Sequence, residues 1–376
     1  MTRVLVVNAG SSSLKYEVLE AESGASVVSG LVERIGDPGS VVPDHAAALA
    51  AVLEGLDAES IDAVGHRIVH GGTVFVRATV IDDAVESEIE RLAVLAPLHN
   101  PPGLVGIRAA RAVLPFVPHV AVFDTAYHAT LPPEAYTYAI DAAVAARHGV
   151  RRYGFHGTSY RYVTRRAAEV LGRPLEELRL VVLHLGNGAS AAAVAGGVSV
   201  NTSMGMTPLE GLVMGTRSGD IDPAVLVHLQ RVGGYDAAGL DDLLNRSSGL
   251  KGLGGHSDMR DLISAVDRGD QAAALAFEVY VTRVQRYIGA YAAELGGIDA
   301  LVFTAGVGEN SSRVRARAVD RLGFLGIVVD DTLNSTPSVA ARVVSPADSA
   351  VAVLVVPTNE ELQIARETVE VVRGEA

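Results

Sequence analysis

The 376-residue chain contains no cysteine. Disulfides, thiolate zinc sites, iron–sulfur clusters and a cysteine nucleophile are therefore excluded. We also expect no signal peptide, because the apolar run after Met1 is too short and no cleavage-like site follows it. Both observations fit a reducing compartment, and we expect a cytoplasmic protein.

Several common catalytic motifs are missing as well. The sequence has no Gly-Lys dipeptide, which excludes a Walker A loop, and no G-x-G-x-x-G follows the first predicted strand. None of the eleven histidines shows the H-E-x-x-H spacing of a zinc protease. A G-x-S-x-G motif is also absent, so serine hydrolase chemistry has no support.

Positive charge is scarce, with 31 Lys and Arg against 44 Asp and Glu and a formal net charge of −13. Such a surface repels nucleic acid and anionic membranes, so we expect neither as a partner. The stretch 180–209 carries no charged residue, but it is rich in Gly, Asn, Ser and Thr and predicts strands and turns of a buried core. Any site for an anion must be built locally from a few arginines, lysines and backbone N–H groups.

The hydrophobic share of 49% supplies ample core material, and the length suggests two or three domains. Val4–Val7 and Ser13–Glu20 predict a strand–turn–strand unit. Arg179–Leu185 and Ala191–Val194 predict a second such unit about half a chain later. This weak internal repeat predicts two related domains that face each other.

Helical patterns alternate with these strands, which indicates an α/β protein. They cover Asp82–Leu95, Ser159–Leu171, Asp270–Leu295 and the segment from Gly308 to Leu322 that follows a strand at Ala300–Phe303. No low-complexity linker is present, so we expect a hinge near Tyr127.

Three turns rich in Gly, Ser or Asn directly follow apolar strands: Asn8–Ser13, Gly186–Gly188 and Thr304–Asn310. Backbone N–H groups of such turns can bind phosphate oxygens without a positive surface. For one turn alone an ordinary loop is the better interpretation. Three together favour phosphate binding, and Lys15 lies just past the first of them.

Charged residues flanked by glycines form a second candidate set. Arg67 and Arg217 each lie in a glycine-rich segment, where a guanidinium suits a carboxylate or phosphoryl group, although a surface arginine has about equal weight for each alone. Asp124 and Glu360 follow apolar strands, where a carboxylate either contacts a Mg²⁺-bound water or caps a helix. His156 lies in the segment Tyr153–Gly157.

Ten motifs in order give the chain an end-to-end resemblance to the acetate kinase family. They are Val7–Lys15, His66–Gly72, Pro97–Pro102, Phe123–His128, Tyr153–Gly157, His184–Gly188, Met214–Asp220, Ser257–Arg260, Thr304–Asn310 and Thr358–Glu361. The resemblance implies two domains with duplicated actin-like, ribonuclease H-like cores and a nucleotide cleft between them. It places 1–126 plus 362–376 in the first domain, with a C-terminal helix that crosses back, and 127–361 in a second domain that binds nucleotide and forms a homodimer.

The resemblance also implies roles for individual residues. The catalytic group is Arg67, Asp124, His156 and Arg217, and the Mg²⁺ ligands (Mn²⁺ being possible) are Asn8, Asp124 and Glu360. The acid-binding group is Arg67, Val69, Leu98, His99, Phe155 and Pro208. The nucleotide group for ATP or ADP is Ser11, Ser13, Lys15, His184, Leu185, Gly186, Asn187, Gly188, Asp258, Met259, Arg260, Gly306, Val307, Gly308, Glu309 and Asn310.

The implied activity is reversible transfer of the γ-phosphoryl group of ATP to acetate by a direct in-line step. A carboxylate needs no general base, because its pKa lies far below 7. Propionate or butyrate kinase activity remains an alternative, since one methylene in an apolar pocket is worth only about 1–3 kcal/mol. A non-catalytic ATP-binding switch is less favoured, because it has no use for Arg67, Arg217 and His156. Tyr160 stands where the family usually has His, and we expect no catalytic effect there.

Overall fold

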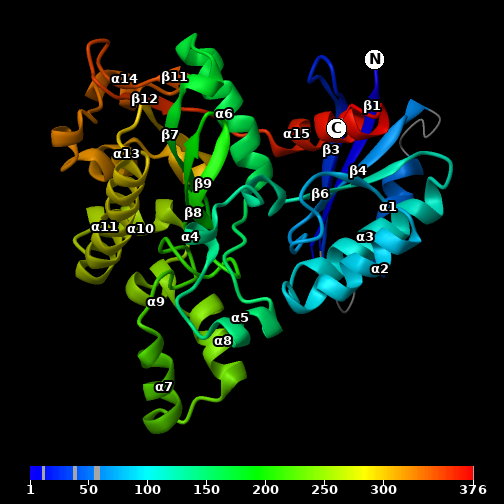
Figure 1. The fold of residues 1–376 in the computed structure, drawn as a ribbon, viewed down its shortest axis with the longest axis horizontal. Coiled ribbons are helices and arrows are strands. Elements are labelled where there is room, and N and C mark those ends of the chain that lie inside the picture. The colour runs from blue at the N-terminus through cyan, green and yellow to red at the C-terminus, as the bar shows by residue number, and fades with distance from the viewer. Residues whose placement is uncertain (11–12, 37–39, 55–59, 376) are drawn as a thin grey trace. The chain divides into compact units, whose positions relative to one another are not determined.

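The structure is a computed structural model that describes residues 1–10, 13–36, 40–54 and 60–375. The chain divides into two compact units (Figure 1). Unit 1 comprises Met1–Ala129, Phe155–Tyr162 and Asn359–Ala376, and unit 2 comprises Thr130–Gly154 and Val163–Thr358. Unit 1 therefore includes Phe155–Tyr162, a segment that the sequence analysis placed in the second domain.

A six-stranded mixed sheet forms the centre of unit 1, with the order β3-β2-β1-β4-β6-β5. The strands are β1 (Arg3–Ala9), β2 (Ser13–Glu20), β3 (Ser26–Glu33), β4 (Ala63–Ile68), β5 (Thr79–Val80) and β6 (His119–Phe123). β1, β4 and β6 run parallel, and the remaining strands pair antiparallel with their neighbours. The predicted hairpin is β1–β2, where the Gly10 amide donates to the Ser13 carbonyl at 2.7 Å.

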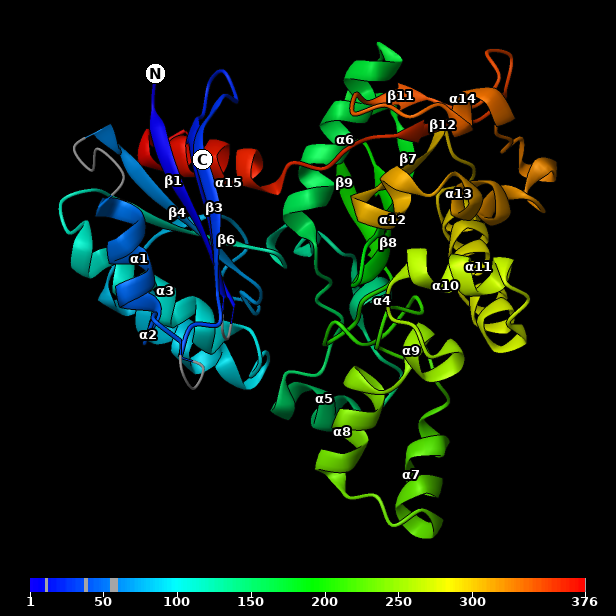
Figure 2. The ribbon, with the colours of Figure 1, turned by 180° about the vertical axis from the view of Figure 1, so that it is seen from behind.

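Unit 2 repeats this sheet strand for strand, in the order β9-β8-β7-β10-β12-β11 (Figure 2). Its strands are β7 (Arg179–Leu185), β8 (Ala189–Ala195), β9 (Val198–Thr202), β10 (Ala300–Thr304), β11 (Arg342–Val343) and β12 (Ala352–Val355). Again the three middle strands are parallel and the others antiparallel. Even the register shift between the second and third strands recurs, at Val18/Leu19 and Ala193/Val194. The predicted α/β class and duplicated cores are confirmed.

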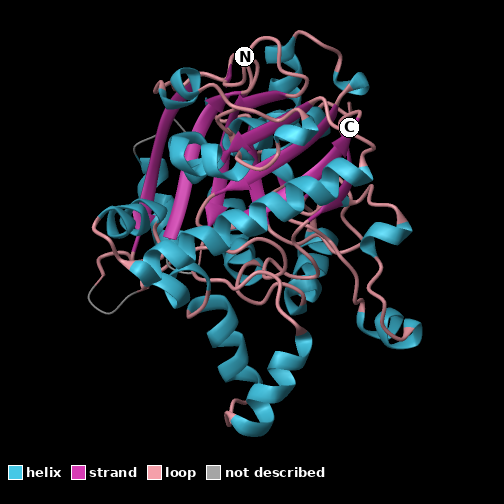
Figure 3. Cartoon of the chain, turned by 90° about the vertical axis from the view of Figure 1, so that its left-hand side faces the viewer, coloured by secondary structure: helices cyan, strands magenta, loops and turns pink. Residues whose placement is uncertain are grey.

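Fifteen helices are named among the described residues, and they cover the sheets or extend from them (Figure 3). In unit 1 these are α1 (His45–Glu54), α2 (Asp83–Arg91), α3 (Asn100–Val113) and α15 (Glu360–Val372), and α6 (Gly157–Leu171) begins in unit 1 and continues into unit 2. Unit 2 adds α4 (Pro133–Tyr136), α5 (Ala142–His148), α7 (Pro223–Val232), α8 (Ala237–Arg246), α9 (Gly249–Gly254), α10 (Met259–Asp267), α11 (Gln271–Glu294), α12 (Ala305–Asn310), α13 (Ser312–Val319) and α14 (Asp331–Ser335). Within the described part of the chain, no helix combines the length and apolar character that crossing a membrane requires.

Two of the predicted helices differ in detail from the observed ones. The helix expected at Asp82–Leu95 is α2, capped by the Asp82 carboxylate on the Val85 amide at 2.8 Å and followed by a 3₁₀ turn. The segment after Gly308 forms two helices, because Ser311 leaves the helical conformation and caps α13 through its hydroxyl on the Val314 amide.

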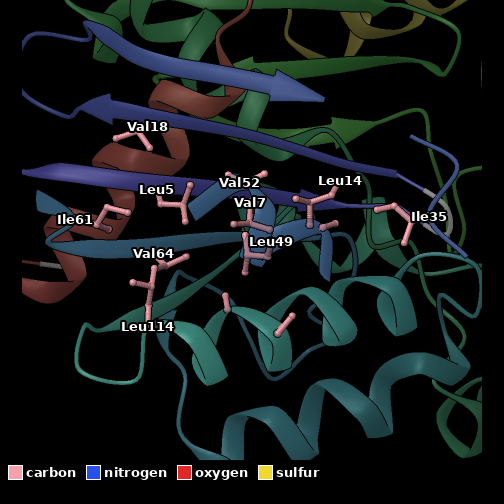
Figure 4. Packing of buried hydrophobic residues seen from close by; sticks show 13 residues of the cluster. Leu5, Val7, Leu14, Val18, Ile35, Leu49, Val52, Ile61, Val64 and Leu114 are labelled. Atoms are coloured by element: carbon pink, nitrogen blue, oxygen red, sulfur yellow. The ribbon is translucent and has the colours of Figure 1, made fainter. Parts of the chain in front are cut away.

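One face of the unit 1 sheet packs against α1 and α3 (Figure 4). Leu5 and Val7 of β1 point from the sheet toward Leu49 of α1 and Leu114 at the end of α3. Alternate residues of β1 face opposite sides of the sheet, so Val4 and Val6 belong to a second cluster. Both faces of β1 are therefore buried, as its continuous apolar run predicts.

The second cluster is the contact between the sheet and α15. Ile364 and Val369 of α15 pack with Val4 and Val6. Gly65 of β4 permits this approach, because a Cβ there would lie 2.5 Å from Thr368 Oγ1 and 2.7 Å from Ile364 Cγ2. The glycine thus lets the last helix lie flat on the first sheet, with its N-terminus near the carboxyl ends of the parallel strands.

In unit 2 the long helix α11 packs against β8. β8 reads ASAAAVA, and all but its last residue are buried. Side chains this small let a helix approach the strand closely.

Two buried histidines join β4 to β6. His66 Nε2 lies 3.0 Å from His119 Nδ1, and His119 Nε2 lies 3.0 Å from the Leu114 carbonyl oxygen. The carbonyl can only accept, so His119 donates to it and accepts from His66. Burial lowers the pKa of both imidazoles, and the neighbouring ring lowers that of His66 further. Both rings are therefore neutral in the folded protein at neutral pH.

This pair predicts a loss of stability in mild acid. Below pH 6.5, the ordinary pKa of histidine, the unfolded chain binds protons that the folded chain does not. The free energy of unfolding should then fall by up to about 1.4 kcal/mol per pH unit for each histidine. Urea unfolding between pH 8 and pH 5 measures this slope.

His119→Gln should flatten the profile, because an amide can accept from His66 and donate to Leu114 without titrating. His148→Gln, at an exposed helix end, is the matched control and should leave the slope unchanged. Equal slopes in all three proteins would contradict the prediction.

Candidate active site

The carboxyl ends of β1, β4 and β6 lie at one edge of the unit 1 sheet, because these strands are parallel. In the register, Val7 pairs with His66 and Arg67 with Val122. Asn8, Arg67 and Asp124 are consequently brought to that edge from three separate parts of the sequence.

The buried carboxylate of Asp124 and the partly buried guanidinium of Arg67 form a two-pronged ion pair. Arg67 Nε donates to Asp124 Oδ1 at 3.2 Å, and Nη2 donates to Oδ2 at 2.7 Å. The Thr158 hydroxyl adds a bond of 3.3 Å to Oδ1, and Asp124 is only 1% exposed. Burial by itself would lower the pKa of the Arg67 guanidinium, but Asp124 and Glu360 outweigh burial and raise it. Arg67 is therefore fixed in orientation and remains charged.

Glu360 enters this edge from the first turn of α15. The Asn359 side chain caps the helix by accepting from the Leu362 amide at 2.9 Å. Glu360 Oε2 then lies 3.8 Å from Arg67 Nε. Burial raises the pKa of the Glu360 carboxyl, an effect that Arg67 opposes and Asp124 reinforces. Two carboxylates thus share one guanidinium, which leaves excess negative charge at the edge.

Lys15 also has a partner in unit 1. Its ammonium forms an ion pair with the carboxylate of Glu361, the second residue of α15. Lys15 was predicted to bind nucleotide, and that role stays a prediction.

His156 adopts a left-handed backbone conformation, with φ of 60°. This conformation costs a non-glycine residue roughly 1–2 kcal/mol and is concentrated at functional sites. The next residue, Gly157, donates its amide to the Asp124 carbonyl at 2.9 Å, and a Cβ there would lie 2.2 Å from that oxygen. The tight contact ties His156 to the end of β6, beside Asp124.

Besides Arg67, four predicted acid-binding residues belong to unit 1. Phe155 is fully buried, and its ring makes a T-shaped contact with the His70 ring at 5.5 Å between ring centroids. Val69 and His99 are partly buried, and Leu98 is 51% exposed. Pro208 belongs to unit 2 and is partly buried.

Unit 2 uses the same edge of its sheet differently, with glycine-rich backbone in place of charged side chains. β7 ends in the turn Gly186–Gly188, and β10 runs into α12. The turn packs on Gly215, whose amide donates to the Asn187 carbonyl at 3.0 Å. A Cβ at Gly215 would lie 2.1 Å from Asn187 Oδ1, so this approach requires glycine.

A cavity of about 860 Å³ lies beside these segments. Eight predicted nucleotide residues line it: Gly186, Asn187, Asp258, Met259, Arg260, Gly306, Val307 and Asn310. Five others, His184, Leu185, Gly188, Gly308 and Glu309, are neighbours in sequence that do not line it. Ser13 and Lys15 lie in unit 1, and Ser11 lies outside the described residues.

Glu309 has a structural contact instead. Its carboxylate accepts from the Thr358 amide at 3.1 Å, and burial raises its pKa. At the rim of the cavity, Arg260 donates two bonds to the Asp258 carboxylate and lowers the pKa of Asp258 to about 2.

Arg217 differs from Arg67 in its surroundings. Among the described residues it forms no ion pair, and its Nη1 donates to the Pro208 carbonyl at 3.2 Å. Burial lowers the pKa of the Arg217 guanidinium, because no carboxylate compensates for the lost water. A partly buried cation without an anion is suited to an anionic ligand.

Known proteins resemble this chain over its whole length. A profile described as the acetokinase family matches residues 3–366. The chain belongs to the acetokinase family. An acetate kinase of Leifsonia xyli subsp. xyli is 58% identical, with 99% of each chain covered. The crystal structure of Porphyromonas gingivalis acetate kinase matches with a TM-score of 0.95 at 43% identity, covering 99% of this chain and 100% of that one. A propionate kinase from Francisella tularensis subsp. tularensis SCHU S4 matches with a TM-score of 0.93 at 38% identity, covering 98% and 100%.

Several cavity residues of this acetokinase were missed in the sequence. They are Gly215, Leu250, Ser257, Ile263, Tyr280 and Ser311. Leu250, Ile263 and Tyr280 belong to amphipathic helices, where the spacing of apolar residues is the same for a core face and for a cavity wall. Ser257 and Gly215 belong to the family motifs Ser257–Arg260 and Met214–Asp220, but only the folded structure reveals that they line the cavity.

The predicted metal ligands of this acetokinase are two carboxylates and one amide. Among the described residues there is no cluster of three or more His, Asp or Glu side chains able to hold a metal ion. Mg²⁺, however, keeps several waters and uses one or two protein carboxylates. Asp124 and Glu360, which both face Arg67, fit that requirement as oxygen donors.

Proposed function

We propose that this acetokinase transfers the γ-phosphoryl group of ATP to acetate, reversibly, giving acetyl phosphate and ADP. The observation that carries the proposal is Arg217, a partly buried guanidinium that no described carboxylate neutralises. A carboxylate substrate or a phosphoryl group supplies the missing negative charge. The curated relatives at 54–58% identity are named acetate kinases, whereas the propionate kinase is 38% identical, which favours acetate.

The reaction requires orientation and charge stabilisation more than covalent chemistry. One acetate oxygen forms the new bond to phosphorus while the bond to the bridging oxygen of ADP breaks, and ADP leaves with that electron pair. The acetate oxygen is already ionised at neutral pH, so no side chain has to accept a proton. Arg67, Arg217 and His156 would donate hydrogen bonds to the equatorial oxygens of the group in transit.

The pocket of unit 2 is the proposed site for the nucleotide. The amides of Gly186–Gly188 and Gly306 suit phosphate oxygens, because backbone donors need no net positive surface. Asn8, Asp124 and Glu360 would hold Mg²⁺ or Mn²⁺, which when bound neutralises part of the charge on the nucleotide phosphates. The predicted cytoplasmic location belongs to the same proposal.

The choice of acid can be tested directly. ADP formation with Mg²⁺ and ATP should be fastest with acetate, slower with propionate and butyrate, and negligible without acid. The product should be trapped as an acyl phosphate. A preference for propionate would make the chain a propionate kinase with the same mechanism. ATP binding without acid-dependent turnover would support the alternative of a non-catalytic ATP-binding switch.

Replacing Arg217 tests its proposed role in phosphoryl transfer. Arg217→Ala should lower kcat on the order of 10³-fold, because a donor to the transition-state oxygens is lost. Arg217→Lys should recover only part of this, since an ammonium cannot replace the planar fork. Arg268→Ala, an exposed arginine of unit 2 bonded to Ser264, is the matched control and should keep normal turnover. A folded Arg217→Ala protein with near-normal kcat would remove Arg217 from the mechanism.

We also propose a homodimer formed through unit 2. α7 has no buried residue, although Val225, Val227 and Val232 lie on it with 37%, 43% and 69% of their surface exposed. In Figures 1 and 3, α7 and α8 extend from the rest of unit 2. An apolar helix without a covering element is typical of a subunit interface.

Light scattering should therefore give twice the mass of one chain. The double variant Val227→Glu/Val232→Glu should shift the protein toward monomer, because it places charge on the exposed helix. Phe324→Glu changes another exposed apolar residue of unit 2, 81% exposed, and should leave the dimer intact. A dimer in both variants would place the interface elsewhere.

A further inference from the structure

The cavity of unit 2 has two chemically different walls. One wall is the glycine-rich backbone of Gly186, Asn187 and α12. The other wall consists mainly of apolar side chains from three helices: Leu250 of α9, Met259 and Ile263 of α10, and Tyr280 of α11. These helices pack on one another, so their lining residues form a single apolar wall.

Tyr280 places a polar atom in this apolar wall. The side chain is 1% exposed, and its hydroxyl has no hydrogen-bond partner among the described residues. A buried hydroxyl without a partner costs about 1–3 kcal/mol, so it is rare in folded proteins and calls for a physical explanation. Phenylalanine would fill the same space without that cost.

We infer that the Tyr280 hydroxyl donates a hydrogen bond to a ring nitrogen of the purine base when a nucleotide occupies this cavity. The inference rests on the proposed assignment of the cavity to the nucleotide. It makes Tyr280 a specificity-determining residue for the base, in addition to the apolar contact that its ring provides.

The chemistry of the two walls supports this orientation of the nucleotide. Phosphates are matched by the backbone amides of the glycine wall, so the base is left for the apolar wall. Burial raises the pKa of the Tyr280 hydroxyl, which therefore keeps its proton and acts as a donor at neutral pH. The adenine ring offers acceptor nitrogens at N1, N3 and N7. The oxygen is shielded from water, so small rotamer changes of the wall must accompany binding.

Titration calorimetry with ADP and its 1-deaza, 3-deaza and 7-deaza analogues tests the inference, because each analogue replaces one acceptor nitrogen by C–H. Tyr280→Phe should bind ADP about 5- to 10-fold more weakly than the wild type. The wild type should bind one of the three analogues more weakly than ADP, by a similar factor. Tyr280→Phe should bind that analogue and ADP with equal affinity. The ligand-free variant should unfold at the same or a higher temperature, because an unpaired hydroxyl has been removed.

Two further variants make the outcomes distinct. Tyr291→Phe removes a hydroxyl from the same helix away from the cavity and should bind ADP normally. Gly306→Phe should abolish binding, since a Cβ there meets no atom within 4 Å and the ring would enter the cavity. Normal binding by Gly306→Phe would refute the assignment of the cavity itself.

If Gly306→Phe blocks binding, two results would overturn the role of Tyr280 alone. One is unchanged ADP affinity in Tyr280→Phe. The other is that Tyr280→Phe loses affinity for ADP and for all three analogues by the same factor. If Tyr280→Phe instead no longer distinguished 2′-deoxy-ADP from ADP, the hydroxyl would contact the ribose and not the base.

Discussion

The parallel pairing of three strands in each sheet is the constraint on which the charged edge of unit 1 and the glycine-rich edge of unit 2 each depend. Parallel neighbours end at the same edge, so residues that follow β1, β4 and β6 meet regardless of their separation along the chain. Arg67 and Asp124 are 57 residues apart and still form a bond of 2.7 Å. α15 contributes Glu360 only because Gly65 admits the helix to the sheet. A shift of one residue in the β4–β6 register would turn Arg67 to the opposite face and dismantle the set.

The two arginines solve different electrostatic problems. Arg67 lies between Asp124 and Glu360, which hold its guanidinium in one orientation and raise its pKa. Its charge is already compensated, so the role proposed for Arg67 toward an anionic substrate is that of a positioned N–H donor. Arg217 has no compensating carboxylate among the described residues, and burial lowers its pKa. An anion bound beside Arg217 would supply the compensating charge that the described residues do not.

Local patterns made much of the fold predictable from the sequence. The apolar runs and the turns after them located the strand pairs at Val4–Glu20 and Arg179–Val194, and with them the duplication. The break between α12 and α13 at Ser311 was not predicted. The apolar spacing continues through this residue, whereas its side chain caps a new helix. Membership of Phe155–Tyr162 in unit 1 depends on the contact of Gly157 with Asp124, which no local pattern encodes. The residues of the candidate site were predicted from the family resemblance. The ion pair of Arg67 with Asp124 and the apolar wall that contains Tyr280 depend on tertiary contacts, which the sequence does not reveal.

Duplication of one sheet has produced two edges with different chemistry. In unit 1 the edge carries charged side chains, held by Thr158, Gly157 and α15. In unit 2 the same edge carries backbone amides beside a cavity with one apolar wall. This division suits a chain with a net charge of −13, because backbone amides bind phosphate oxygens without adding a surface cation. Arg67 and Arg217 are the two arginines proposed to act where charge is transferred. The acidic surface and the anionic substrates are compatible for that reason.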